Sequence, residues 1–296
     1  MVKVGLALPT IDIRTGGPAT LSSLAARAEA AEKAGFDSVW VMDHFWSGRS
    51  EGRVGAHEPM VTLAYLAART SRLRLGPLVA CNSFRHPGQL GRESLALADA
   101  SDGRFVLGLG AGWYRPEYDA FGFPFDHRVS RLEETLTVLT PLLRGERVTY
   151  EGRYLRLQDA SLVRTTDPPP LWIAASGPRM MELTARYADG WNDAWYGPDP
   201  SDFRASLGEL QKAMAAAGRP AGELEISAGV FVLPDPDAGP EDSRAIVGGP
   251  EHVAERIRAY GDAGADLVIV SLARNPFVEL DPSYPEKMAE VLRHLG

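Results

Sequence analysis

A carboxylate and an imidazole stand side by side at Asp43 and His44, after the apolar run 39–42 and before Phe45 and Trp46. Histidine exchanges protons near neutral pH, and a neighbouring carboxylate can tune or orient its ring. The pair therefore predicts a proton-transfer site with Asp43 and His44 as catalytic residues, and Phe45 and Trp46 as substrate contacts. The alternative is that His44 only hydrogen-bonds its own loop.

A glycine-rich segment further along has the composition of a ligand contact. Gly110, Ala111 and Gly112 would let the backbone approach a planar ligand, and Glu117 is placed to add a polar contact. Packing explains the same glycines equally well. The spacing is not the G-x-G-x-x-G that opens a helix, and no Walker lysine follows, so neither a dinucleotide-binding fold nor an NTPase is supported.

The small residues Ala175, Ser176 and Gly177 precede a helix that is expected to begin near Arg179. Backbone N–H groups at such a helix start form an anion site, which would suit a cofactor phosphate. Ser176 would alternatively serve as the helix cap.

The segment 78–87 passes from apolar to small polar residues, so it could press against a flat ring. Its candidate ring contacts are Leu78, Val79, Ala80 and Asn82. Cys81 has no clear base nearby in the sequence and is interpreted as a soft wall residue, and His86 as a loop or capping residue. Asn192 and Trp195 belong to an aromatic and polar run that would line a substrate pocket or pack the rim.

Short apolar runs rich in β-branched residues alternate with longer segments of helical spacing, as strands and helices do around a parallel sheet. The runs that fit strands are Lys3–Leu8, Ser38–Met42, Leu73–Val79, Arg104–Leu109, Leu171–Ala175, Gly190–Ala194, Glu223–Val232 and Leu267–Leu272. They predict an α/β fold, a (β/α)8 TIM barrel, in which the loops after the strands build the active site. The candidate segments follow these strands, so the barrel would bring them to one end.

An insertion separates the fourth and fifth strands. Residues 147–150 and 154–157 have the pattern of a small β-hairpin outside the barrel. No linker or shift in composition divides the chain, so residues 1–296 are expected to form a single domain.

Composition excludes several classes of function. The 39 acidic and 31 basic residues give a net charge of -8, which disfavours nucleic acid as a partner. The apolar runs fall far short of the roughly 20 residues of a membrane-spanning helix, and the N-terminus lacks the features of a signal peptide, so a cytoplasmic location is expected. One cysteine, Cys81, fits a reducing compartment and excludes a metal site of several thiolates.

Four of these segments together resemble the luciferase-like flavin-dependent superfamily, especially its branch that uses the deazaflavin coenzyme F420. They are 38–45, 72–79 with 84–87, 103–114 and 170–178, in the same order and spacing. The resemblance covers nearly the whole chain and implies a (β/α)8 barrel with an insertion. It also implies a bulge after the third strand that supports the ring, with a non-proline cis peptide at Leu78-Val79.

In that branch an Asp-His pair ends the second strand, as Asp43 and His44 do here. The resemblance implies that His44 exchanges a proton beside the hydride-carrying carbon and that Asp43 contacts the edge of the ring. It favours F420 over FMN as cofactor, and it implies a homodimer. Unlike the sugar-phosphate dehydrogenases of the branch, the rim at Trp195 and Tyr196 offers no evident pair of lysines, so an apolar or aromatic substrate is expected.

The predicted function is hydride transfer between coenzyme F420 and a small organic substrate, with a separate cofactor-reducing enzyme as a potential partner. One alternative is an FMN-dependent monooxygenase supplied by a partner reductase. Another is a non-catalytic flavin-binding protein.

Overall fold

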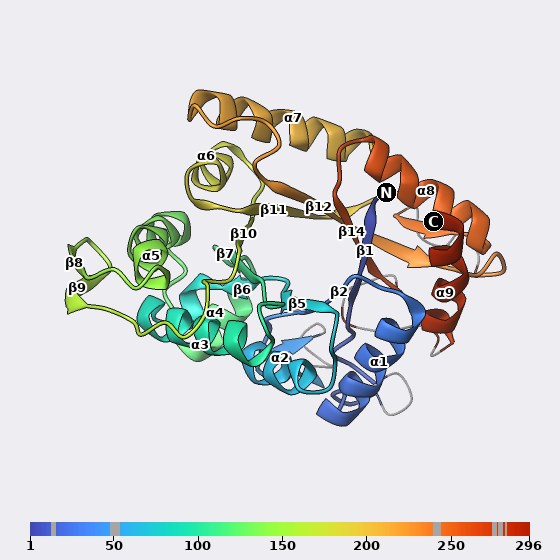
Figure 1. The fold of residues 1–296 in the computed structure, drawn as a ribbon, viewed down its shortest axis with the longest axis horizontal. Helices are drawn as coiled ribbons and strands as arrows, with labels where there is room; N and C mark the ends of the chain where they lie inside the picture. The colour runs from blue at the N-terminus through green and yellow to red at the C-terminus, as the bar shows by residue number, and fades with distance from the viewer. Residues whose placement is uncertain (13–15, 48–53, 239–243, 274–276, 278–280, 282) are drawn as a thin grey trace.

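The computed structural model describes residues 1–12, 16–47, 54–238, 244–273, 277, 281 and 283–296. Parallel strands run in the order β5-β2-β1-β14-β12-β11-β10-β7-β6, and helices surround them (Figure 1). The strands are β1 (Lys3–Ala7), β2 (Ser38–Val41), β5 (Arg74–Pro77), β6 (Ala80–Cys81), β7 (Leu107–Gly110), β10 (Leu171–Ala174), β11 (Gly190–Tyr196), β12 (Glu225–Leu233) and β14 (Leu267–Ser271).

The strands β5 and β6 are two parts of the third strand, interrupted at Leu78 and Val79. β6 pairs with β7, while β5 meets the approach to β7 through the bridge Leu75–Phe105. Backbone hydrogen bonds from Leu75 N to Arg104 O (3.1 Å) and from Val106 N to Leu75 O (2.9 Å) complete this seam. The predicted eight-stranded barrel is thereby confirmed, although the fourth strand begins at Leu107 instead of Arg104.

The helices that follow the strands pack around the outside of the barrel (Figure 1). They are α1 (Leu21–Ala34), α2 (Pro59–Ala67), α3 (Pro87–Ala100), α5 (Arg128–Leu143), α6 (Pro178–Tyr187), α7 (Ser201–Ala216), α8 (Pro250–Asp262) and α9 (Tyr284–Leu295). Glycines end two of the helical segments as the sequence predicts, because Gly35 and Gly264 adopt φ of 102° and 108°.

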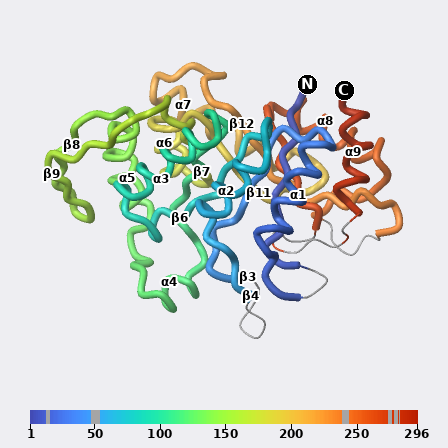
Figure 2. Tube along the Cα trace, turned by 60° about the horizontal axis from the view of Figure 1, so that its bottom comes forward, coloured from blue at the N-terminus to red at the C-terminus, as the bar shows by residue number. Residues whose placement is uncertain are grey.

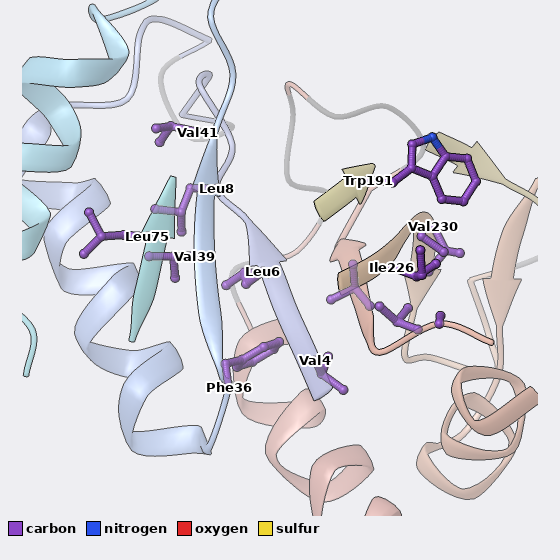
Figure 3. Packing of buried hydrophobic residues seen from close by; sticks show 14 of the residues in the cluster. Val4, Leu6, Leu8, Phe36, Val39, Val41, Leu75, Trp191, Ile226 and Val230 are labelled. Carbon is purple, nitrogen blue, oxygen red and sulfur yellow. The ribbon is translucent and has the colours of Figure 1, made fainter. Parts of the chain in front are cut away.

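Alternate residues of each barrel strand face opposite sides. Val4, Leu6 and Leu8 point from β1 and its end toward the helices, and Val39 and Val41 do so from β2 (Figure 3). These side chains are at most 4% exposed and belong to the cluster that joins the barrel to its helices. Burial of this layer is the main source of stability that the strand pattern provides.

The other side of each strand fills the barrel interior. Trp40 and Trp172 stack there with ring centroids 5.1 Å apart, and both are 1% exposed. Gly5 and Gly76 make room for Trp40, because a Cβ at either position would lie 2.8 Å from an atom of its ring. At the level of these two rings the barrel interior is therefore a packed core.

The end of the barrel where the strands begin is fixed by paired polar groups. Arg74 donates to both carboxylate oxygens of Glu225 at 2.7 and 2.9 Å. The carboxylates of Asp37, Asp189 and Asp266 each accept the N–H of a residue on a neighbouring strand. Both chain termini lie at this end, whereas α4 (Arg115–Phe121), β3 (Trp46–Ser47) and β4 (Val54–Gly55) lie at the other (Figure 2).

Shorter elements decorate the barrel. The predicted hairpin forms between β7 and β10 from β8 (Val148–Glu151) and β9 (Arg156–Ala160), and it projects beyond α5 (Figure 1). A short helix, η1 (Asn82–Phe84), follows β6, and β13 (Ala245–Val247) pairs with the end of β12. Among the described residues, no helix combines the length and apolar composition that crossing a membrane requires.

Candidate active site

A cavity of about 580 Å³ opens at the end of the barrel where the strands finish. Its walls come from the segments that follow β2, β5, β7 and β10 and from the second half of β11, as expected for a barrel enzyme. The predicted site residues in its wall are Asp43, His44, Leu78, Val79, Ala80, Gly110, Ala111, Gly112, Glu117, Ala175, Ser176, Asn192 and Trp195. Segments far apart in the chain therefore meet at one cavity.

The His44 ring is held from one side by a buried carboxylate. Its Nδ1 lies 2.9 Å from Oε2 of Glu117, and the Glu117 side chain is only 1% exposed. Oε1 of Glu117 also accepts the backbone N–H groups of Phe45 (2.7 Å) and Trp46 (3.3 Å). A carboxylate at Nδ1 favours the tautomer with the proton there, which leaves Nε2 with a free lone pair. Among the described residues, Nε2 has no hydrogen-bond partner.

Aromatic rings surround the rest of the His44 imidazole. Phe277, Trp113 and Tyr114 meet it edge to face, with centroid distances of 5.2, 5.8 and 6.1 Å. These rings form an apolar wall around a group able to exchange a proton.

Asp43 has a different partner from the one the sequence suggests. Its carboxylate receives hydrogen bonds from Arg85, with Nη1 to Oδ2 at 2.5 Å and Nη2 to Oδ1 at 3.2 Å. It also accepts the backbone N–H of Cys81 at 2.7 Å. Asp43 therefore ties the end of β2 to β6, and the carboxylate that orients His44 is Glu117. Burial alone would lower the pKa of Arg85, but the carboxylates of Asp43 and Glu58 outweigh burial and raise it.

The wall between the two parts of the third strand carries the predicted cis peptide at Leu78-Val79. The Val79 side chain packs over β7, where a Cβ at Gly110 would lie 2.8 Å from Val79 Cγ2. Gly112 has φ of 80°, and a Cβ there would collide with the Tyr118 hydroxyl. The glycines of this turn are therefore required both for close packing and for backbone conformation.

Cys81 is a buried wall residue, as its sequence context suggests. Its Sγ lies 3.1 Å from the Tyr118 hydroxyl, and burial raises the pKa of the thiol to about 11. At neutral pH the group is a thiol, which is a poor nucleophile.

The segment after β10 turns into α6 without a side-chain cap. Gly177 is the cap residue with φ of 81°, and Ser176 is exposed at the cavity and makes no cap hydrogen bond. Ser176 is therefore available to a ligand, and the capping alternative is wrong.

On the next strand, Asn192 donates from Nδ2 to Ser227 Oγ at 3.0 Å, and Trp195 stacks on Phe231 with centroids 4.8 Å apart. A second cis peptide lies at Ala194-Trp195. Burial raises the pKa of Asp193, whose carboxylate accepts the Tyr196 hydroxyl at 2.6 Å. These contacts fix the far wall of the cavity.

A family model described as luciferase-like monooxygenase matches residues 3–240. The chain belongs to this family. An F420-dependent hydroxymycolic acid dehydrogenase from Mycobacterium tuberculosis is 34% identical over 270 residues, which cover 82% of this chain and 72% of that protein. An F420-dependent glucose-6-phosphate dehydrogenase from Nakamurella multipartita is 37% identical over 216 residues, which cover 71% of this chain and 62% of that protein.

Solved structures share the fold of this luciferase-like protein. Coenzyme F420-dependent tetrahydromethanopterin reductase from Methanopyrus kandleri superposes with a TM-score of 0.80 at 21% identity, over 100% of this chain and 99% of that chain. An F420-dependent secondary alcohol dehydrogenase superposes with a TM-score of 0.84 at 19% identity, over 100% of this chain and 99% of that chain. A monooxygenase from Streptomyces bottropensis superposes with a TM-score of 0.79 at 22% identity, over 99% of this chain and 97% of that chain. These likenesses confirm the barrel.

Four predicted site residues of this luciferase-like chain lie outside the cavity wall. Phe45 stacks on Phe121 with centroids 4.0 Å apart, and Trp46 packs against the same ring at 5.2 Å. Asn82 is buried, and Gly177 caps α6. Phe45 and Trp46 therefore belong to an aromatic cluster with Phe121, and their backbone N–H groups bond to Glu117.

Several wall residues of the luciferase-like site were not predicted from the sequence, namely Phe84, Trp113, Tyr114, Tyr118, Arg128, Val129 and Met180. Trp113 and Tyr114 directly follow the glycine turn, so their position after the fourth strand was an available signal. Arg128 offered no such signal, since it lies far along the chain at the start of α5.

Proposed function

We propose that this protein is an oxidoreductase that transfers a hydride between coenzyme F420 and a small organic substrate, with His44 exchanging the accompanying proton. The observation that carries this proposal is the His44 ring, held at Nδ1 by buried Glu117 while Nε2 stays free in the cavity wall. Relatives named as F420-dependent dehydrogenases support the choice of cofactor.

The cavity suits a flat ring joined to a phosphate. Val79 and Ala80 would support one ring face, the backbone from Gly110 to Gly112 would border it, and Ser176 would face the phosphate at the start of α6. When bound, a deazaflavin supplies a ring carbon that gives or takes a hydride and does not activate dioxygen.

His44 is placed to accept a proton from a substrate hydroxyl, or to return it to a carbonyl oxygen, through Nε2. Glu117 then balances the positive charge that the ring gains, at 2.9 Å from Nδ1. Asp43 has a positioning role, because its carboxylate already accepts hydrogen bonds from Arg85 and from the Cys81 N–H. We therefore assign Asp43 the role of holding the ring-supporting segment against the end of β2.

The rings around His44 favour an apolar secondary alcohol or its ketone as substrate. Trp113, Tyr114 and Phe277 offer no hydrogen-bond partner for a sugar ring on their faces, and no lysine occurs among the described residues that line the cavity. A sugar phosphate would leave polar groups unpaired against this wall.

Cofactor titration tests the proposal. Fluorescence titration should give F420 binding in the micromolar range or tighter, with FMN binding at least about tenfold weaker. Tight FMN binding without F420 binding would instead favour an oxygen-dependent monooxygenase supplied by a reductase, and the fold likeness to a monooxygenase makes that the alternative to test. Binding without any turnover would favour a non-catalytic flavin-binding protein.

We further propose that residues 1–296 act as one unit, in the cytoplasm, as a homodimer, with a separate enzyme renewing the cofactor. The exposed side of α2 carries Val61 and Tyr65, which are 61% and 36% exposed, so this face is the one to test for a dimer. Val61→Asp should shift a dimer toward monomer in analytical ultracentrifugation. An unchanged sedimentation coefficient would exclude this face.

A further inference from the structure

Arg128 is a cation of the cavity wall that the proposed reaction does not use. It is the first residue of α5, half-buried, and it lines the same cavity as His44 and Ser176. Its guanidinium carbon lies 3.6 Å from the centroid of the Phe125 ring, so the planar group is stacked in place.

The hydrogen bonds of Arg128 fix its plane and leave one edge open. Nε donates to Gly112 O at 3.1 Å, and Nη1 donates to Phe125 O at 2.8 Å. Both acceptors are neutral carbonyls. Among the described residues, Nη2 has no partner and no carboxylate forms an ion pair with Arg128. The side chain is therefore a rigid, uncompensated positive charge with free donors.

The carboxylates that share the cavity are all engaged elsewhere. Asp43 is bound to Arg85, Glu117 to His44, and Asp193 to the Tyr196 hydroxyl. A half-buried guanidinium without a counter-ion is costly unless an anion from outside completes the site. The planar fork of arginine matches the oxygens of a phosphate.

The start of α6 is close to the start of α5. Glu133, about one and a half turns after Arg128, forms ion pairs with Arg179 (2.8 Å) and Arg186 (3.3 Å) of α6, and the two helices lie side by side (Figure 1). Neither helix has an acidic residue in its first turn. An anion held by Arg128 would thus also meet the backbone N–H groups that follow Ser176.

We propose that Arg128 binds the phosphate of the ring cofactor, together with the start of α6, and so places the ring toward His44. This inference rests on the proposed function, because it takes the ring to lie between Val79 and His44. The phosphate is assigned to the cofactor and not to the substrate, since Arg128 contacts the glycine turn at Gly112 while the aromatic substrate wall surrounds His44.

The test compares ligands that differ only in the phosphate. The 8-hydroxy-5-deazariboflavin alcohol, its 5′-phosphate and F420 are titrated by fluorescence into the wild type, Arg128→Met, Arg128→Lys and Arg115→Met. Arg115 is the matched control, because its guanidinium also lies over Phe125 (5.1 Å) but pairs with Asp119 and is absent from the described cavity wall.

The wild type should bind the 5′-phosphate about 10- to 100-fold tighter than the alcohol. Arg128→Met should remove most of that difference while leaving the affinity for the alcohol within about twofold, Arg128→Lys should be intermediate, and Arg115→Met should match the wild type. The affinity for the alcohol also reports that the variant is folded.

Two results for Arg128→Met would overturn the assignment of Arg128 alone. One is an equal loss of affinity for the alcohol and the 5′-phosphate, and the other is no loss of affinity for either ligand. If the wild type binds none of the three ligands, the proposed function fails, and this inference fails with it.

Discussion

Charged and titratable side chains are hydrogen-bonded to different extents at the two ends of the barrel. Where the strands begin, Arg74 and Glu225 satisfy each other through two hydrogen bonds, beside the tightly stacked pair of Trp40 and Trp172. Where the strands finish, His44 is held on one side only and faces an open cavity. At the first end these charged groups are paired with each other, whereas at the second His44 Nε2 keeps free bonding capacity.

This difference separates side chains that stabilise the fold from those that meet a ligand. Glu117 belongs to both groups, because it fixes two backbone N–H groups and also orients His44. Buried polar groups that are fully paired specify structure, while a buried group with one unpaired side is a candidate for chemistry. Substitutions at the two ends should therefore affect different measured quantities.

The largest expected effect is on catalysis at the open end. His44→Ala should lower kcat by about 10²- to 10⁴-fold, because general acid–base catalysis contributes an effect of that size. F420 affinity and thermal stability should stay close to those of the wild type. His86→Ala is the matched control, since His86 only caps α3 by accepting the Gly88 N–H at 3.1 Å. An unchanged kcat in His44→Ala would remove its assigned role.

The next effect concerns stability in the packed interior, beside the end where the strands begin. Trp172→Ala should lower the free energy of unfolding by about 3 to 5 kcal/mol, because it empties a site in the packed interior. Trp113→Ala, at a side chain that is 67% exposed beside His44, should change stability by under about 0.5 kcal/mol and raise the KM for substrate. Chemical denaturation measures the first quantity and steady-state kinetics the second. Equal destabilisation by both changes would contradict the distinction between the ends.

A smaller effect on kcat is expected at Glu117, which both fixes backbone N–H groups and orients His44. Glu117→Gln keeps an oxygen that can accept the Phe45 N–H but removes the charge beside His44, so kcat should fall about 10- to 100-fold with little change in KM. Steady-state kinetics on the folded variant checks this split. A rise in KM at unchanged kcat would show that Glu117 serves binding instead.

The smallest effect is on thiol reactivity. Burial raises the pKa of Cys81 to about 11, so the thiolate fraction of the folded protein is low at pH 8 and grows as the pH rises toward that value. Alkylation by iodoacetamide at pH 8 should therefore be slow in the folded protein and fast after unfolding. Rapid labelling of the folded protein at pH 8 would contradict a buried, protonated thiol.

The sequence predicts the barrel well because each strand carries its own local signal. Alternating apolar residues and glycines such as Gly35 mark where strands begin, and the observed ends differ by only a few residues. The cavity-lining segments follow from the same pattern, since every barrel places the residues after its strands at one end.

The partners of individual side chains could not be predicted in this way. Glu117 and His44 are far apart in the sequence, and so are Asp43 and Arg85, and nothing local indicates which acid meets which base. Phe45 and Trp46 follow His44 directly, yet their side chains turn into the aromatic cluster with Phe121 because Glu117 fixes their backbone. Side-chain direction in loops is set by such tertiary contacts, which periodicity does not encode.

The most direct test of the proposed hydride transfer is the rate at which the absorbance of F420 changes when the wild-type protein is mixed with a panel of apolar secondary alcohols in the absence of oxygen. We expect substrate-dependent reduction of the cofactor at the same rate with or without oxygen, and a rate at least about 100-fold lower in His44→Ala. A reaction that proceeds only with oxygen and FMN, or one that is indifferent to His44, would contradict it.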